Sequence, residues 1–176
     1  MIGVFDSGFG GLTILKELLN KLPQYNYIYL GDNARAPYGS KSQDVIYNYT
    51  KEAVDFLFSQ GCELIIIACN TASAKALRKI QQEYLPNKYP DKKVLGVVIP
   101  AVEIAAETIN HKNKKVGVIG TRSTIESKVY EKELNKLAKD IEIFSQSCPL
   151  LVPLVEEGML KRVETKMILK KYWRWL

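Results

Sequence analysis

The sequence has few of the residues that build most metal, disulfide and hydrolase sites. It contains three cysteines and one histidine in 176 residues. The cysteines are odd in number and include no Cys-x-x-Cys pair, which excludes a disulfide framework and a zinc site. His111 lies in a polar loop away from the expected ligand-binding edge, so a Cys-His or Ser-His-Asp hydrolase lacks its base. A functional cysteine here is expected to act as a thiol, and no metal is expected.

The sequence also lacks membrane and targeting signals. No apolar run approaches the roughly 18 residues that would span a bilayer. The N-terminal residues form neither a basic leader nor a signal-peptide core, so we expect a cytoplasmic protein with no membrane contact. The net charge of +6 comes mostly from lysines scattered over helical faces, without the aromatic and arginine cluster of a nucleic-acid-binding module. We therefore expect no nucleic acid partner and assign the charge to solubility.

Short apolar runs alternate with amphipathic segments along the chain. The apolar runs predict strands at 2–5, 27–30, 64–68, 94–99, 116–119 and 141–144. The amphipathic segments predict helices near 11–22, 42–60, 72–84, 101–110, 123–138 and 161–172. This alternation predicts an α/β fold, with a parallel sheet covered on both faces in a three-layer αβα arrangement.

A polar stretch bracketed by two prolines, residues 86–91, is the best linker candidate. It predicts a boundary near 92–98 and two domains, 1–93 and 94–176. Strand-to-helix units around 2–13 and 116–124 each pass through a small polar loop, which hints that the two halves are related.

The loop Asp6-Ser7-Gly8-Phe9-Gly10-Gly11 follows the first predicted strand, where ligands of open α/β sheets bind. It is neither a Rossmann fingerprint, because Thr13 replaces the third glycine, nor a phosphate-binding P-loop. One interpretation is a glycine-rich turn that lets the backbone approach a ligand closely. The alternative is a helix N-cap provided by Asp6 or Ser7.

Cys69 stands where a buried strand gives way to a helix. A helix N-terminus favours an anion, so a thiolate at Cys69 would be stabilised as a base or nucleophile. Simple packing of a buried cysteine is the alternative. Asn70 and Thr71 favour function, because they add polar donors where a packing position would have apolar neighbours. Cys62 and Cys148 have no such neighbours.

Five motifs stand in the order and approximate spacing of one enzyme family. They are Asp6-Ser7-Gly8, Gly31-Asp32 through Pro37-Tyr38-Gly39, Ala68-Cys69-Asn70-Thr71-Ala72, Gly120-Thr121 and Pro153-Leu154-Val155-Glu156-Glu157-Gly158. On these motifs the chain resembles the bacterial glutamate racemases of the aspartate/glutamate racemase superfamily. The related aspartate and hydantoin racemases share the cysteine but not the joint Asp-Ser-Gly and Pro-Tyr-Gly loops.

The resemblance implies a racemase that uses no cofactor, pyridoxal included. Two thiols flank the substrate Cα; one removes a proton from one face and the other delivers a proton to the opposite face. Cys69 is implied as one catalytic thiol and Asp6 as its acid-base supporter. The implied substrate-binding residues are Ser7, Tyr38, Gly39, Asn70, Thr71, Thr121 and Thr124, with Glu156 or Glu157 assisting.

The family's second cysteine lies in a Cys-Thr-His motif after the Val-Glu-Glu-Gly segment, and the sequence reaches Leu176 without one. The resemblance therefore implies a C-terminally truncated racemase with an incomplete second domain and impaired activity. A frameshift, a premature stop or a deliberate cut would each give this ending. The last helix would then expose Ile168, Leu169, Trp173 and Trp175 and promote self-association, which leaves a homodimer open.

Three functions stay open. The first is interconversion of L- and D-glutamate in the supply of peptidoglycan precursors. The second is an aspartate-type racemase on the same scaffold. The third is a non-catalytic remnant that keeps an amino-acid-binding half-site.

Overall fold

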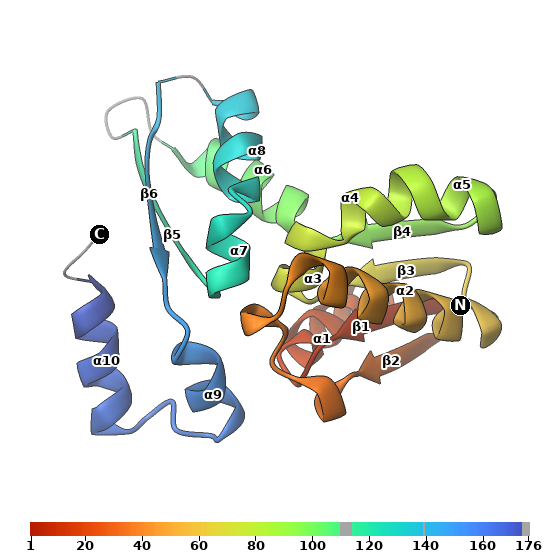
Figure 1. The fold of residues 1–176 in the computed structure, drawn as a ribbon, viewed down its shortest axis with the longest axis horizontal. Helices are drawn as coiled ribbons and strands as arrows, with labels where there is room; N and C mark the ends of the chain where they lie inside the picture. The colour runs from red at the N-terminus through yellow and green to blue at the C-terminus, as the bar shows by residue number, and fades with distance from the viewer. Residues whose placement is uncertain (110–113, 139, 174–176) are drawn as a thin grey trace. The chain divides into compact units, whose positions relative to one another are not determined.

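The computed structural model describes residues 1–109, 114–138 and 140–173. The chain divides into two compact units, Met1–Val97 and Val98–Leu176, and each is described by itself (Figure 1). All strand pairs in the described residues are parallel, and along the chain the strands alternate with helices. The predicted α/β class is therefore confirmed. The interpretations given for His111 and Trp175 lie outside the described residues.

The first unit is built on a four-stranded parallel sheet with the strand order β2-β1-β3-β4. The strands are β1 (Ile2–Asp6), β2 (Tyr27–Gly31), β3 (Leu64–Ile67) and β4 (Lys93–Gly96). All residues of β1 are buried, as expected for a strand with neighbours on both sides and helices over both faces.

Helices connect these strands in an order that fixes the layers. They are α1 (Gly11–Lys21), the short turns η1 (Asn33–Arg35) and η2 (Tyr38–Ser40), α2 (Gln43–Ser59), α3 (Asn70–Lys75), α4 (Leu77–Lys79), the π-helical turn η3 (Ile80–Tyr84) and α5 (Leu85–Lys88). The chain moves from β1 out to β2 and then back across to β3, so right-handed connections place α1 and α2 on opposite faces of the sheet. Since α3 packs against α2, the two share a face and the unit has three layers.

The main core lies between α2 and this sheet. Ser42 caps α2 by accepting a hydrogen bond from the amide of Val45 at 3.4 Å. Helical spacing turns Ile46, Val54 and Leu57 inward, where they join Phe5 in one buried cluster. Each such side chain contributes about 1.5–3 kcal/mol by leaving water. This core fixes the sheet whose carboxyl edge carries the polar loops.

The second unit has a two-stranded parallel sheet of β5 (Lys115–Gly120) and β6 (Glu142–Ser147). Its helices are α6 (Val98–Thr108), α7 (Arg122–Glu126), α8 (Val129–Leu137), α9 (Leu151–Glu156) and α10 (Val163–Trp173). The apolar core among its described residues is small and centres on Val102, Val118 and Leu134. On α10 the side chain of Trp173 is exposed, whereas Ile168 and Leu169 are half-buried. Self-association through α10 stays a prediction.

Three element predictions are wrong. The strand predicted for 94–99 ends at Gly96, because α6 begins at Val98; short apolar runs fit either structure. The helix predicted for 123–138 breaks at Lys128, whose φ of 54° is left-handed. Residues 86–91 are no linker but part of α5 and the turn into β4, inside the first unit. The chain divides after Val97, and the assignment of its two parts as racemase domains stays a prediction.

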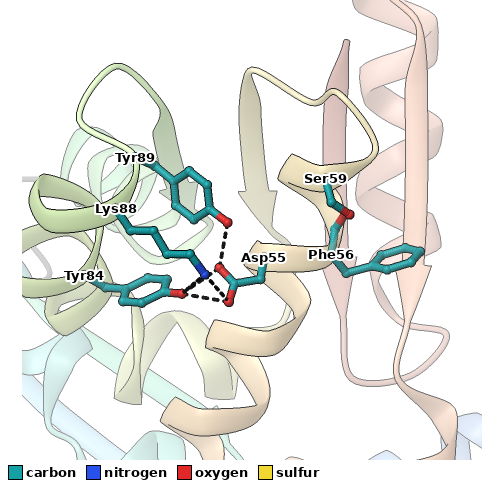
Figure 2. A network of polar contacts seen from close by, with 6 residues as sticks. All are labelled: Asp55, Phe56, Ser59, Tyr84, Lys88 and Tyr89. Carbon is teal, nitrogen blue, oxygen red and sulfur yellow. Dashed lines mark hydrogen bonds and ion pairs between the residues drawn. The ribbon is translucent and has the colours of Figure 1, made fainter.

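A carboxylate on α2, that of Asp55, binds the segment from the end of η3 to the residue after α5 (Figure 2). The hydroxyl of Tyr84 donates to the two oxygens of Asp55 at 2.6 and 2.7 Å, and that of Tyr89 donates at 3.0 Å. Lys88 Nζ lies 3.0 Å from Asp55 Oδ2. Burial by itself raises the pKa of Asp55, but the hydrogen bonds from Tyr84, Lys88 and Tyr89 outweigh it and hold that pKa below its ordinary value.

Replacing Asp55 with Asn is expected to destabilise the protein at pH 7 by about 1–2 kcal/mol, because three donors lose a charged acceptor. A carboxyl group with a lowered folded pKa stabilises above its ordinary pKa, which is 3.8 for Asp55, and that stability is lost as the pH falls through the folded pKa. The gap in melting temperature between wild type and D55N should therefore close at low pH. Ser59→Ala is the control, since Ser59 donates only to the carbonyl of Phe56 in the same helix, at 2.7 Å. A gap independent of pH would contradict this account.

Candidate functional site

Three polar loops meet at the carboxyl edge of the first sheet. The register pairs Phe5 with Ile67 of β3 and Asp6 with Gly31 of β2. Just beyond, the amide of Ala68 donates to the carbonyl of Phe5 at 2.8 Å, and the amide of Asp32 donates to the carbonyl of Asp6 at 2.9 Å. The register therefore brings the loops that begin at Asp6, Asp32 and Cys69 together, as expected at this edge of a parallel sheet.

Cys69 lies at the N-cap of α3 and is 5% exposed. Its Sγ accepts a hydrogen bond from the amide of Ala72 at 3.4 Å and lies 3.3 Å from Ser7 Oγ. Burial raises the pKa of the Cys69 thiol and the nearby Asp6 carboxylate raises it further, against the smaller effect of hydrogen bonds from Ser7 and Ala72. The amide of Ala72 at the start of α3 lowers the pKa of Cys69 as expected, but desolvation outweighs it, and the catalytic role of Cys69 stays a prediction.

Asp6 ends β1 and is 7% exposed. Its Oδ2 accepts a hydrogen bond from the amide of Gly8 at 2.9 Å. Burial raises the pKa of Asp6, and backbone hydrogen bonds from Gly8, Gly11 and Ser7 offset this only in part. The first residue of α1 has to be glycine, because a Cβ at Gly11 would lie 2.6 Å from the Cβ of Asp6. The N-cap of α1 is Gly10, so neither Asp6 nor Ser7 is the N-cap residue, although the Asp6 carboxylate accepts a hydrogen bond from the amide of Gly11, the first residue of α1.

Tyr38 lies inside the first unit with 1% of its surface exposed. Its hydroxyl donates to Asp32 Oδ2 at 2.5 Å, and Arg35 Nε donates to the same oxygen at 2.6 Å. Arg35 also pairs with Glu52 of α2 at 2.5 Å. Burial raises the pKa of Tyr38, and its hydrogen bond to Asp32 adds to this. Since the Tyr38 side chain is engaged in this network, ligand binding by the turn at Tyr38 and Gly39 would use its backbone.

The other predicted binding residues divide between the two units. Asn70 is exposed as the first residue of α3, and Thr71 beside it is buried. Thr121 and Thr124 belong to the second unit, where Thr121 Oγ1 caps α7 by accepting from the amide of Thr124 at 3.2 Å. A binding role for these four residues stays a prediction.

Glu156 ends α9 in the second unit, and Glu157 follows it as the C-cap. Both are exposed, and their assisting role stays a prediction. Cys148 of the same unit is buried, and its Sγ donates to the carbonyl of Gln146 at 3.6 Å.

Two residues at this edge were not singled out from the sequence. Tyr29 of β2 donates its hydroxyl to the carbonyl of Gly8 at 2.8 Å. Arg35 completes the Asp32 network described above. The sequence signal for Tyr29 is its place two residues before Gly31, which puts both on one face of β2 beside the central strand. Arg35 carries no such signal, because its partners depend on the tertiary fold.

The described residues contain no group of three or more His, Cys, Asp or Glu side chains that could hold a metal ion. Among those same residues, no helix is long and apolar enough to cross a membrane. The edge of the first sheet offers a buried thiol next to a carboxylate and a hydroxyl, at the N-terminus of α3. Such a set suits proton transfer at a carbon acid that carries carboxylate groups.

Comparison with known proteins gives one consistent result. A family model described as Asp/Glu/Hydantoin racemase matches residues 10–168. The glutamate racemase of Persephonella marina is 43% identical over 171 residues, 97% of this chain and 62% of the relative. That of a Sulfurihydrogenibium species is 46% identical over 172 residues, 97% of this chain and 63% of the relative.

Solved structures agree with the sequence relatives. A glutamate racemase isoform from Bacillus anthracis superposes with a TM-score of 0.88 at 35% identity, covering 98% of this chain and 62% of that one. The glutamate racemase of Francisella tularensis in complex with D-glutamate gives 0.85 at 40% identity, covering 99% and 62%. The chain therefore spans less than two thirds of the length of these relatives.

The raised pKa of Asp6 predicts a pH-dependent effect of Asp6→Asn on stability. A carboxyl group with a raised folded pKa adds stability below its ordinary pKa, which is 3.8 here, and that stability is lost as the pH rises through the folded pKa. At pH 7 the Asn variant avoids the buried charge and should melt a few degrees above wild type, the scale of about 1 kcal/mol. The advantage should disappear toward pH 4. Asp91→Asn, at an exposed turn, serves as control. A melting temperature of D6N that lies below that of wild type by the same amount at every pH would contradict the prediction.

Proposed function

Because this chain belongs to the Asp/Glu/Hydantoin racemase family, we propose that its Cys69 is one of the two thiols of a glutamate racemase that needs no cofactor. The observation that carries the proposal is the position of Cys69 Sγ, buried 3.3 Å from Ser7 Oγ and beside Asp6. Glutamate as substrate is supported by the relatives named glutamate racemase and by the D-glutamate complex of the Francisella tularensis protein. Supply of D-glutamate for peptidoglycan in the cytoplasm belongs to the same proposal, and a homodimer stays open.

The electrostatics of this edge suit a thiol whose ionisation is favoured by a positive charge placed beside it. Desolvation and the carboxylate of Asp6 both raise the pKa of Cys69, which disfavours the thiolate. The α-ammonium group of glutamate would bring a positive charge next to Asp6 and Cys69, which favours the thiolate. Amides at the start of α3 and the Ser7 hydroxyl would then bind the substrate carboxylates.

The chemical step moves one proton. Before this step the Cys69 thiol gives its proton to Asp6, its proposed acid-base supporter. The Cys69 thiolate then takes the proton from Cα and becomes a thiol, while the electron pair of the C–H bond stays on the substrate as a carbanion. Return of that proton to the same face restores the starting enantiomer. Inversion requires a second acid on the opposite face, and the 176 residues contain no Cys-Thr-His motif. Cys148 is buried and its Sγ is bonded to the carbonyl of Gln146, which does not favour it as that acid.

The polypeptide of these 176 residues is therefore expected to exchange the Cα hydrogen of one glutamate enantiomer slowly and to invert neither. Proton NMR in deuterated water, with each enantiomer supplied separately, measures exchange, and chiral chromatography measures inversion. Cys69→Ser should abolish exchange, whereas the matched control Cys62→Ser should retain it, because Cys62 lies in the turn before β3, away from the polar loops.

Each other outcome has a defined meaning. Accumulation of the opposite enantiomer at about 1 per second or faster would show that a second acid lies within these residues. Undiminished exchange in Cys69→Ser would show that Cys69 only packs. Faster exchange with aspartate than with glutamate would identify an aspartate-type racemase, and no exchange with any of them would favour the non-catalytic half-site.

A further inference from the structure

Gly8 is held at both of its backbone polar groups. Its amide donates to Asp6 Oδ2 at 2.9 Å, and its carbonyl accepts the hydroxyl of Tyr29 at 2.8 Å. Asp6 is a residue of the proposed chemistry, whereas Tyr29 lies on the neighbouring strand β2 and donates its hydroxyl to this loop. One glycine therefore connects a strand residue to the carboxylate beside Cys69.

The end of β2 is pressed against the same loop. A Cβ added at Gly31 would lie 3.1 Å from the carbonyl oxygen of Gly8 and 3.2 Å from Cε1 of Tyr29. The amide of Asp32, the next residue, donates to the carbonyl of Asp6 at 2.9 Å. The loop between Asp6 and Gly8 thus has little room to move relative to β2, and Tyr29 supplies the side-chain hydrogen bond that fixes its far end.

The Tyr29 hydroxyl stays a neutral donor in this setting. Burial raises the pKa of Tyr29, and the nearby acidic groups of Asp6 and Cys69 raise it further. The titratable groups around Asp6 are thus Tyr29 from β2 and Cys69 from the loop after β3. Cys69 also raises the pKa of Tyr38 from η2, and the start of α1 brings Gly10 and Gly11 next to Asp6. A change of Tyr29 to Phe removes the hydrogen bond without removing a charge.

We infer that Tyr29 is a positioning residue, whose hydroxyl holds Gly8 so that the Gly8 amide binds Asp6 and orients its carboxylate beside Cys69. The importance of this orientation for proton transfer rests on the proposed function. The link from Tyr29 through Gly8 to Asp6 does not rest on the proposed function. It consists of the two hydrogen bonds of Gly8 and the close approach of Gly31 to the Gly8 carbonyl.

The test compares two tyrosines of the same strand. Tyr27 lies two residues before Tyr29, and its hydroxyl also donates to backbone carbonyls, those of Leu22 at 2.9 Å and Leu18 at 3.4 Å. These acceptors belong to the end of α1 and the residue after it, away from the Asp6 loop. Tyr29→Phe and Tyr27→Phe each remove one hydroxyl that donates to backbone carbonyls. Only Tyr29→Phe removes a hydrogen bond to the Asp6 loop.

The readout is the pKa of Asp6, followed by carbon NMR of its side-chain carboxyl group across pH and assigned with D6N. In Tyr29→Phe the Gly8 amide should bind Asp6 less well, so the pKa of Asp6 should rise by about half a pH unit. In Tyr27→Phe it should equal that of wild type. Exchange and racemisation play no part in the measurement, so its outcome is independent of whether the proposed function is correct.

An unchanged pKa of Asp6 in Tyr29→Phe, or an equal change in both variants, would overturn the inference. If Tyr29→Phe does not fold, Gly31→Ala provides the second test, because its Cβ would press on the Gly8 carbonyl, the Tyr29 ring and the Asn33 side chain at 3.1–3.2 Å, so that each has to shift. That variant should also raise the pKa of Asp6, and a wild-type value in it would again overturn the inference.

Discussion

The parallel pairing of β1 with β2 on one side and β3 on the other is the constraint on which the site depends. It sets the last residue of β1 beside the last residue of β2 and carries the chain after β3 back to the same edge. Asp6, Asp32 and Cys69 then follow the ends of three adjacent strands. A slip of one residue in either pairing would turn these side chains to the wrong face, so the core beneath α2 and the site are specified together.

Burial decides the electrostatics of this edge. Asp6 and Cys69 are both nearly inaccessible, and desolvation is the largest influence on the pKa of each. The amides of the Asp6 loop and of α3 act in the opposite direction but do not prevail. The site therefore contains two acidic groups whose pKa values are both raised, and a positive charge placed beside them would lower both pKa values. The ammonium group of the proposed substrate would supply such a charge.

The sequence predicts those elements and site residues whose signal lies in neighbouring residues. It does not predict contacts that depend on the register of the strands. Apolar runs located β1, β2 and β3, and the polar residues after them pointed to Asp6 and Cys69 before any contact was known. The run at 94–99 was misassigned because it holds the end of a strand and the start of a helix, and the break at Lys128 has no glycine to mark it. The links from Tyr29 to Gly8 and from Arg35 to Asp32 join residues whose proximity only the folded chain creates.

Titration of the isotope-labelled 176-residue polypeptide with D- and L-glutamate, followed by amide NMR, tests most directly whether this edge is a glutamate half-site. The account predicts that the largest shift changes lie at the amides of Ser7, Gly8, Cys69 and Asn70, and that Cys69→Ser retains them. Shift changes confined to other residues, or none with either enantiomer at millimolar concentration, would contradict it.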